Sequence, residues 1–524
     1  MARPIICCFL VAGSLLLAAT PDFAAEPFQP TWPSLESQYQ TPEWFRDAKF
    51  GIWAHWSAQS EPEQGDWYAR NLYIQGSPDY EYQVAHYGHP SKAGFKEVIH
   101  EWKAEHFDPD KLLAFYKANG AKYFMALAVH CDNCDNYNSK YQPWNSVNLG
   151  PHRDIIGEWA AAAHKLGLRF GVSVHDGGWT WRWYEVSQGA DTNGPLKGVP
   201  YDGKLTKADG LGLWWDGFDP QDLYAQNHPL GAKPDQAYCE KFCNRTKQLW
   251  DDYRPDLIYF DETVVPMGRL GVSDEYGLGL YAHFYNSSIA WHGTNEAVIT
   301  AKMLDAAQRK GLVYDIERGK ASGILPQPWQ TDTCLGDWHY SRELFEKHQY
   351  KTADKVIPML ADIVSKNGNL MLSVPVRADG TIDSDEEKIV ADIGAWLKVN
   401  GEAIYGTRPW KIYGEGPSTE AQEKGHFDGV KDVSSKPYTA ADLRFTQSKD
   451  GKTLYVIGLA FPADGKVTIK SLAENSPNWH GGISSVQMLG VGGELKFTRD
   501  DKGLSVTLPA HKPCAIAFAL KIKE

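Results

Sequence analysis

Two apolar runs of this 524-residue chain end in carboxylates, the side chains that act as acid and base in many hydrolases. Asp261 and Glu262 follow the run 257–260, and Glu317 closes the run "LVYDIE". Successive strand residues point to opposite sides, so Asp261 and Glu262 should not share a pocket if the strand continues that far. Asp261 and Glu317 are the better pair, since cleavage of a glycosidic bond needs one ionised and one protonated carboxyl. The structural alternative is a salt bridge between Glu317 and the adjacent Arg318.

Three histidines also close apolar runs, namely His55, His130 and His175. Imidazoles at three strand ends suit hydrogen bonding to a ligand with many hydroxyls. The segment "HCDNCD" that begins at His130 has zinc-ligand residue types, but no second C-x-x-C or H-x-x-x-H pair accompanies it. We therefore expect no metal and no cofactor. A metal-assisted hydrolase with His130, Cys131 and Asp132 as ligands is kept as an alternative.

The elements that must position these side chains follow from the pattern of the chain. Apolar runs typical of buried strands lie at 50–56, 122–130, 169–175 and 257–262, with weaker ones at 297–300, 312–317 and 369–375. Helical patterns alternate with them; one begins at Asp154 and stops at Gly167, and a capping box of Ser384 and Glu387 opens the last. Continuous apolar strands alternating with helices predict an α/β fold, a (β/α)8-like TIM barrel with its chemistry at the carboxyl ends of the strands.

The chain divides into four regions. A basic start, an apolar run and small residues predict a signal peptide over residues 1–25, hence a secreted or periplasmic protein with no membrane span. The barrel is expected over 26–405, a polar linker over 406–435, and a β-sandwich of short strands over 436–524. This last domain is expected either to bind glycans or to buttress the barrel. Residues 177–234, rich in Gly, Pro and Trp, are expected to form a long functional loop.

Composition narrows the class of partner. The net charge of −13 argues against nucleic acid, because phosphate binding needs a basic surface. The 20 Trp indicate either stacking on sugar rings or a Trp-rich core. Six cysteines follow the signal peptide, and in an oxidising compartment Cys131–Cys134 and Cys239–Cys243 could each close a small loop.

Several segments between about Trp44 and Trp410 together resemble the glycoside hydrolase family 29 α-L-fucosidases. They are "KFGIWAHWS", "GDWYARNLY", "NGAKYFMALAVHCDN", "GPHRDIIGEWAAAAHKLGLRFGVSVH", "SKNGNLMLSVPVRADGTI" and "NGEAIYGTRPW". The segments "ERG" and "PWQTDTCLGDWHY" resemble the branch of that family that cleaves α-1,3/1,4 linkages.

The resemblance implies a retaining exo-glycosidase on a (β/α)-barrel with a C-terminal β-sandwich, acting on fucosylated glycans without a cofactor. It places the nucleophile at Asp261 and favours Glu317 as the acid/base. The implied sugar-binding residues are His55, Asp66, Trp67 and His130. We also expect Cys131, His175, Tyr259 and Trp338 to bind the substrate.

The chain departs from the family pattern around the pocket. It has His130-Cys131 for two histidines, Asp66 for a glutamate, His175 for a tyrosine and Tyr259 for a tryptophan. These departures leave α-L-galactose and sulfated or branched fucosides as alternative substrates. A non-catalytic carbohydrate-binding protein on a degenerate hydrolase scaffold is a further alternative.

Overall fold

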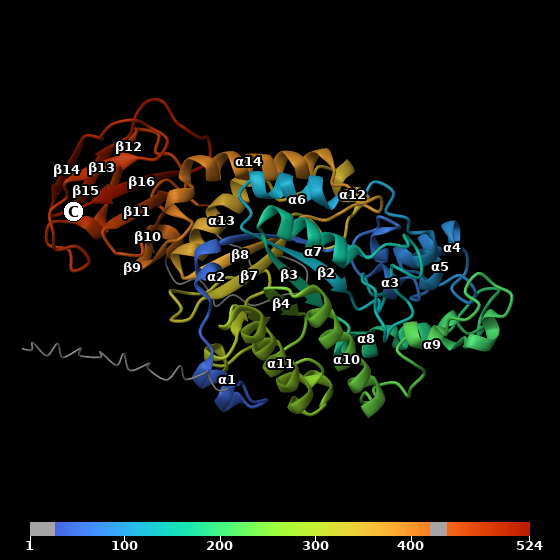
Figure 1. The fold of residues 1–524 in the computed structure, drawn as a ribbon. Helices are drawn as coiled ribbons and strands as arrows, with labels where there is room; N and C mark the ends of the chain where they lie inside the picture. Colours follow the sequence, from blue (N-terminus) through green and yellow to red (C-terminus); the bar gives the residue numbers. More distant parts are fainter. Residues whose placement is uncertain (1–26, 420–437) are drawn as a thin grey trace, which may run out of the picture.

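The structure, a computed structural model, describes residues 27–419 and 438–524 (Figure 1). The predicted signal peptide and most of the predicted linker lie outside the described residues. A barrel surrounded by helices occupies one end of the molecule in Figure 1, and a smaller set of β-strands, in red, occupies the other. None of the helices in the described residues combines the length and the apolar character that crossing a membrane requires.

A closed barrel of eight parallel strands forms the larger part of the described chain, so the predicted fold class is confirmed. The strands run in sequence order around the barrel, and every neighbouring pair is parallel. They are β1 (Phe50–Ala54), β2 (Tyr123–Val129), β3 (Arg169–Val174), β4 (Leu257–Phe260), β5 (Val298–Ala301), β6 (Val313–Asp315), β7 (Trp329–Cys334) and β8 (Gly368–Ser373).

Helices cover most of the crossovers. The long ones are α6 (Pro109–Ala118), α7 (Ile155–Leu166), α10 (Gln236–Tyr253), α11 (Asp274–His292), α13 (Ala353–Ser365) and α14 (Ser384–Asn400). Helix α7 begins after its Asp154 cap and stops at Gly167, whose φ of +64° suits glycine, as predicted. The capping box of α14 is Asp383 with Glu386, one residue before the predicted pair. The Asp383 carboxylate accepts hydrogen bonds from the backbone of residues 385 and 386, which fixes this start.

Shorter helices surround the rim and the ends of the barrel. They are α1 (Trp32–Gln38), α2 (Glu43–Ala48), α3 (Tyr68–Asn71), α4 (Pro78–His86), α5 (Phe95–Glu101), α8 (Gly178–Trp183), α9 (Pro220–Leu223) and α12 (Arg342–Glu346). Helices α8 and α9 belong to the predicted loop 177–234, which therefore has short helical turns of its own.

Strand β7 has no counterpart among the predicted runs, because its sequence, "WQTDTC", contains no apolar stretch. Its polar side chains are nevertheless buried, and they bond inside the barrel. Gln330 accepts from the hydroxyl of Tyr123 at 3.1 Å and donates to Asp315 at 3.0 Å. A polar barrel interior thus hides this strand from a search for apolar runs.

The C-terminal part forms two antiparallel sheets in the described residues, as predicted for a β-sandwich. One sheet has the order β13-β16-β11-β10-β9 and the other the order β12-β15-β14. The strands are β9 (Arg408–Glu415), β10 (Leu443–Gln447), β11 (Thr453–Gly458), β12 (Lys466–Ile469), β13 (Ser485–Met488), β14 (Phe497–Asp500), β15 (Gly503–Thr507) and β16 (Phe518–Lys523). Strand β9 falls within the stretch predicted as a linker, yet it pairs with β10.

Buried polar contacts join this sheet to the barrel. Arg444 of β10 donates to Asp362 of α13 at 2.6 Å, and Lys366 donates to the same carboxylate at 2.8 Å. The indole of Trp396 on α14 donates to the carbonyl of Ala517 at 2.9 Å. These contacts favour the buttressing role over an independent glycan-binding domain.

The structure shows whether the cysteines pair and whether the tryptophans belong to the core. All six cysteines of the described chain are free thiols, so the predicted loop-closing disulfides are wrong; five of the six are buried. Nine tryptophans are fully buried, and all but Trp53, which also lines the cavity described next, belong to the core alone: Trp53, Trp56, Trp102, Trp144, Trp159, Trp181, Trp250, Trp329 and Trp396. A smaller group of tryptophans lines the cavity described next.

Candidate active site

Five consecutive barrel strands are each followed at once by a polar or charged side chain that faces one cavity. The first residues after β1 to β5 are His55, His130, His175, Asp261 and Lys302. Parallel strands of a barrel end on the same rim, which brings these side chains together. The cavity has a volume of about 460 Å³ and is also lined by the residue two positions after β6, Glu317.

All ten predicted site residues line this cavity. They are Asp261, Glu317, His55, Asp66, Trp67, His130, Cys131, His175, Tyr259 and Trp338. The structure therefore brings together side chains that lie up to 283 positions apart, from His55 to Trp338.

A lysine lies between the two carboxylates. Lys302 donates to Asp261 at 2.6 Å and also to Glu317. Two oxygens that share one donor are separated by less than about 6 Å, twice a usual N···O length. The two carboxyls are thus close enough to act on one glycosidic bond together, as the pair in a retaining glycosidase does at about 5–5.5 Å.

The environment drives the pKa values of the two carboxyls apart. Burial alone would raise the pKa of Asp261, but the ammonium of Lys302 and the imidazole of His175 outweigh it and hold that pKa well below its usual value. Burial raises the pKa of Glu317 to about 7, with Asp332 and Asp261 adding to the rise and Lys302 opposing it. Near neutral pH one carboxyl is thus ionised while the other is close to half protonated, a division typical of acid–base catalysis.

Arg318 and Glu262, which are adjacent in sequence to Glu317 and Asp261, have other structural roles. Arg318 directs its guanidinium to the thiol of Cys334 at 2.7 Å, and Glu317 forms its ion pair with Lys302. Glu262 does line the cavity, because β4 ends at Phe260 and strand alternation no longer applies. Its carboxylate accepts from the backbone N–H groups of residues 178 and 179, so it fastens the loop after β3.

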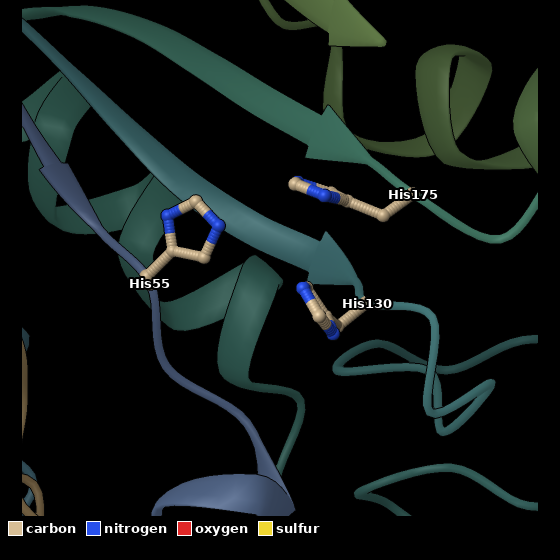
Figure 2. A group of neighbouring side chains, drawn as sticks. All are labelled: His55, His130 and His175. Atoms are coloured by element: carbon tan, nitrogen blue, oxygen red, sulfur yellow. The ribbon is translucent and has the colours of Figure 1, made fainter. Parts of the chain in front are cut away.

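The opposite side of the cavity consists of imidazoles (Figure 2). His55, His130 and His175 project from three adjacent strands, and their nitrogens lie within 4.8 Å of one another. Burial lowers the pKa of all three, and the neighbouring imidazoles add to this at His55 and His130. They are neutral near pH 7 and offer hydrogen bonds rather than charge.

A metal ion does not fit the tautomer of this histidine group. Gln59 accepts from the backbone N–H of Ala69, which directs its amide nitrogen to Nδ1 of His130 at 2.6 Å. An Nδ1 that accepts leaves the proton of the neutral ring on Nε2, where it is a donor and not a metal ligand. The alternative trio of His130, Cys131 and Asp132 is wrong: within the described residues it does not converge, and Asp132 bonds instead to Ser57 at 2.8 Å.

Aromatic rings form the floor and the walls. The ring centroids of Trp53 and Tyr259 are 4.7 Å apart at the floor, and Trp338 lies 5.1 Å from His55. Trp67 packs on Trp183 at 4.8 Å while 44% of it stays exposed at the mouth. Such faces suit the apolar face of a sugar ring.

Two of the residues predicted to bind the sugar, Asp66 and Cys131, also form hydrogen bonds with the backbone of the protein. Asp66 accepts from the backbone N–H groups of Trp338 at 3.0 Å and His339 at 2.8 Å, so it holds the loop after β7. The thiol of Cys131 donates to the carbonyl of His175 at 3.5 Å. Both therefore shape the cavity in addition to lining it.

The backbone is left-handed at three residues next to the site. Trp67, Met303 and Arg318 have φ values of 71°, 59° and 47°, and they follow Asp66, Lys302 and Glu317 directly. Non-glycine residues adopt this conformation at a cost, and such strain clusters at functional sites.

Sequence reasoning missed Lys302, His339 and Asp332. The signal that could have found Lys302 is its position. It directly follows β5, and the residue that directly follows each of the strands β1 to β4 is a predicted site residue. His339 and Asp332 come from the unrecognised β7 region; His339 lies 4.7 Å from His130, and Asp332 lines the cavity.

Comparison with known proteins agrees with this geometry. The alpha-L-fucosidase family model matches residues 15–402, and the alpha-L-fucosidase C-terminal domain model matches residues 436–523. Tissue alpha-L-fucosidase from Macaca fascicularis is 27% identical over 524 residues, covering 97% of this chain and 94% of that protein. The Homo sapiens tissue enzyme is 26% identical over 507 residues, covering 95% and 91%.

Among solved structures, Thermotoga maritima alpha-fucosidase in complex with fucose is similar, with a TM-score of 0.68 at 25% identity. The match covers 94% of this chain and 100% of that chain. Since the first family model spans most of the sequence and the second spans the C-terminal sheets, the chain belongs to the alpha-L-fucosidase family and is a glycoside hydrolase.

Proposed function

We propose that this protein hydrolyses terminal α-L-fucosides by double displacement, with net retention at the anomeric carbon. The observation that carries the proposal is the placement of Asp261 and Glu317 on one ammonium, that of Lys302, with their pKa values driven in opposite directions. The relative from Thermotoga maritima, whose structure holds fucose, supports the choice of sugar.

In the first step, an oxygen of Asp261 attacks the anomeric carbon as its bond to the leaving oxygen breaks. Glu317 gives its proton to that oxygen, and a covalent glycosyl-enzyme ester forms. In the second step, Glu317 takes a proton from water, and the water oxygen displaces Asp261 from the anomeric carbon. Lys302 and His175 hold Asp261 ionised for the attack, while the histidines after β1 and β2 contact the sugar hydroxyls.

Replacement of the nucleophile tests this mechanism. Asp261→Gly should lower turnover of 4-nitrophenyl α-L-fucoside by at least about 10³-fold, and azide should partly restore it by taking the vacant place. The wild-type product, followed by NMR, should first appear as the α-anomer. Near-normal turnover by the variant, or a β-anomer as first product, would rule the mechanism out.

Two measurements separate the alternatives. A matched set of aryl α-L-fucosides and α-L-galactosides should show a higher kcat/KM for the fucosides, since the wider family is named for that sugar. Sugar binding by calorimetry without cleavage of any aryl glycoside would instead identify a non-catalytic binding protein.

We also propose that the mature protein is exported, to the periplasm or outside the cell. The support is the basic and apolar start of the sequence, followed by small residues near position 25. N-terminal sequencing of the protein recovered from the native cells should show the loss of about 25 residues, whereas an intact start in a cytosolic fraction would contradict export.

A further inference from the structure

Arg269 is a cation at the mouth of the cavity that forms no salt bridge within the described residues, although its charge opposes the rise in the pKa of Glu262. It lies on the short 3-10 turn Gly268–Leu270, and its guanidinium is 4.5 Å from the ring of Trp179 on α8. Within the described residues, no hydrogen bond or ion pair joins Arg269 to another side chain or to the backbone. The other cation of the cavity, Lys302, is fully engaged by Asp261 and Glu317.

The turn that carries Arg269 is held by backbone hydrogen bonds and by a buried neighbouring side chain. Met267 precedes it with φ 63° and a fully buried side chain, and Gly271 follows it with φ 72°. Backbone bonds close the turn, from Leu270 to Met267 at 3.0 Å and from Gly271 to Gly268 at 2.9 Å. The arginine side chain is therefore held on a fixed base and by stacking, which leaves the N–H groups at its edge available.

The exposed side chains among the lining residues mark the opening of the cavity to solvent. Among the lining residues of the cavity, Trp67, Arg269 and Met303 are the exposed ones, and Met303 is 71% exposed. The attacked sugar of an exo-acting hydrolase lies deep, next to Asp261, so the departing group must extend toward these residues. Arg269, Trp179 and Met303 thus come from the loops after β4, β3 and β5 to surround the departing group.

The charge of the cavity fixes what Arg269 can recognise. Six carboxyl groups line the cavity, those of Asp66, Asp261, Glu262, Asp315, Glu317 and Asp332. Burial raises the pKa values of Glu262, Asp315, Glu317 and Asp332, so the negative charge of the deep cavity near neutral pH is mainly that of Asp261. An anionic substituent on the deep sugar would be buried close to this like charge, and the one cation there, Lys302, is already held by Asp261 and Glu317. Only the outer position beside Arg269 pairs such a substituent with a cation.

We propose that Arg269, with Trp179 and Met303, forms a leaving-group subsite that selects glycans with an anionic substituent, a carboxylate or a sulfate, on the residue next to the cleaved sugar. This inference rests on the proposed fucosidase activity and names its substrate class. It also excludes a sulfate on the cleaved sugar itself. Trp179 supplies the stacking face and Arg269 the charge-assisted hydrogen bonds.

A matched pair of substrates isolates the effect of a negative charge on the leaving group. The pair is 4-nitrophenyl and 3-carboxy-4-nitrophenyl α-L-fucoside, whose leaving phenols have similar acidity. Arg269→Gln should lower kcat/KM for the carboxylated substrate about tenfold more than for the neutral one, the size of one charge-assisted hydrogen bond. Added salt should reduce the wild-type preference. Equal loss on both substrates, or no loss on either, would overturn the proposal.

Arg182 provides the matched control. It is an exposed arginine on α8, three residues after Trp179, and it is not among the cavity-lining residues. Arg182→Gln removes the same charge from α8, the helix whose Trp179 stacks on Arg269, and should leave the ratio of the two kcat/KM values unchanged. A ratio that falls as far as in Arg269→Gln would show a general field effect, which contradicts a specific subsite.

Binding of uncleavable analogues separates this inference from the proposed function. The S-linked versions of the two substrates are titrated into the wild type and into Arg269→Gln by calorimetry. Tighter wild-type binding of the carboxylated analogue, lost in the variant, supports the subsite even if no O-glycoside is hydrolysed. Equal affinity for both analogues refutes it even if hydrolysis is fast.

Discussion

The two halves of the cavity solve different physical problems. The half after β1 to β3 holds His55, His130 and His175, whose pKa values are lowered by burial, so it is neutral. The half after β4 to β6 holds Asp261, Lys302 and Glu317, which carry or exchange charge. One barrel rim thus places directional donors on one side of a ring and the reacting groups on the other.

The difference shows how a buried site limits the cost of desolvation. Neutral imidazoles bind hydroxyls without the large penalty that a buried unpaired charge would incur. In the deep part of the cavity, Asp261, Lys302 and Glu317 pair with one another, whereas Arg269 lies at the exposed mouth. Substitutions in the charged half should therefore change rate and pH dependence, and substitutions in the neutral half should change affinity.

After the nucleophile, the largest expected effect in the charged half comes from Glu317. Glu317→Ala should slow fucosides with poor leaving groups by about 10²–10⁴-fold, because they need the proton, and activated aryl fucosides far less. The measurement is kcat/KM across a series of aryl fucosides with leaving phenols of different acidity. Equal loss across the series would remove Glu317 from the acid role.

Lys302→Gln should shift the pH profile. In the wild type, activity should fall as pH rises through about 7, where Glu317 loses its proton. The ammonium lowers the pKa of both carboxyls, so its loss should move both limbs of the kcat/KM profile to higher pH and cost about ten- to hundredfold at neutral pH. Lys302→Arg, which keeps the charge, is the control. Limbs that stay in place would assign Lys302 a packing role only.

His55→Phe tests the neutral half. It keeps an aromatic ring beside Trp53 and Trp338 but removes the ring nitrogens. KM should rise about tenfold, the value of a hydrogen bond to a buried group, while the pH limbs stay near their wild-type positions. A shifted limb with unchanged KM would contradict the division of the cavity into two halves.

Gln59→Leu should have the smallest effect. It removes the amide that fixes the tautomer of His130, so KM should rise a few-fold, about the value of one modest hydrogen bond, with kcat nearly unchanged. Gln64→Leu, at an exposed glutamine of the same segment, should have no effect on either constant. If the two variants behave alike, the tautomer of His130 does not matter for binding.

The sequence predicts most of the barrel because seven of its strands are apolar runs on a sheet covered by helices. It predicts His55, His130, His175 and Asp261 for the same reason, since each directly follows such a run. Lys302 follows a shorter, weaker run, and its two partners are distant in sequence, so nothing local indicated its position between the carboxyls.

The failures have a common cause, which is polar structure inside a buried fold. Strand β7 is hidden by Gln330 and Asp332, whose side chains face other polar groups instead of an apolar core. An oxidising compartment would have allowed Cys131 and Cys134 to pair, but both are free thiols, and Cys131 donates a hydrogen bond to a backbone carbonyl. Such partners come from other strands, and no local pattern encodes them.

The contact of Arg444 with Asp362 has a consequence for how the molecule unfolds. Asp362 lies between Arg444 of the C-terminal sheet and Lys366 of its own helix, and all three side chains are buried. Breaking a buried ion pair by removal of one partner costs about 3–5 kcal/mol. The barrel and the C-terminal sheet should therefore unfold together on heating. A calorimetric scan should record a single cooperative transition for both.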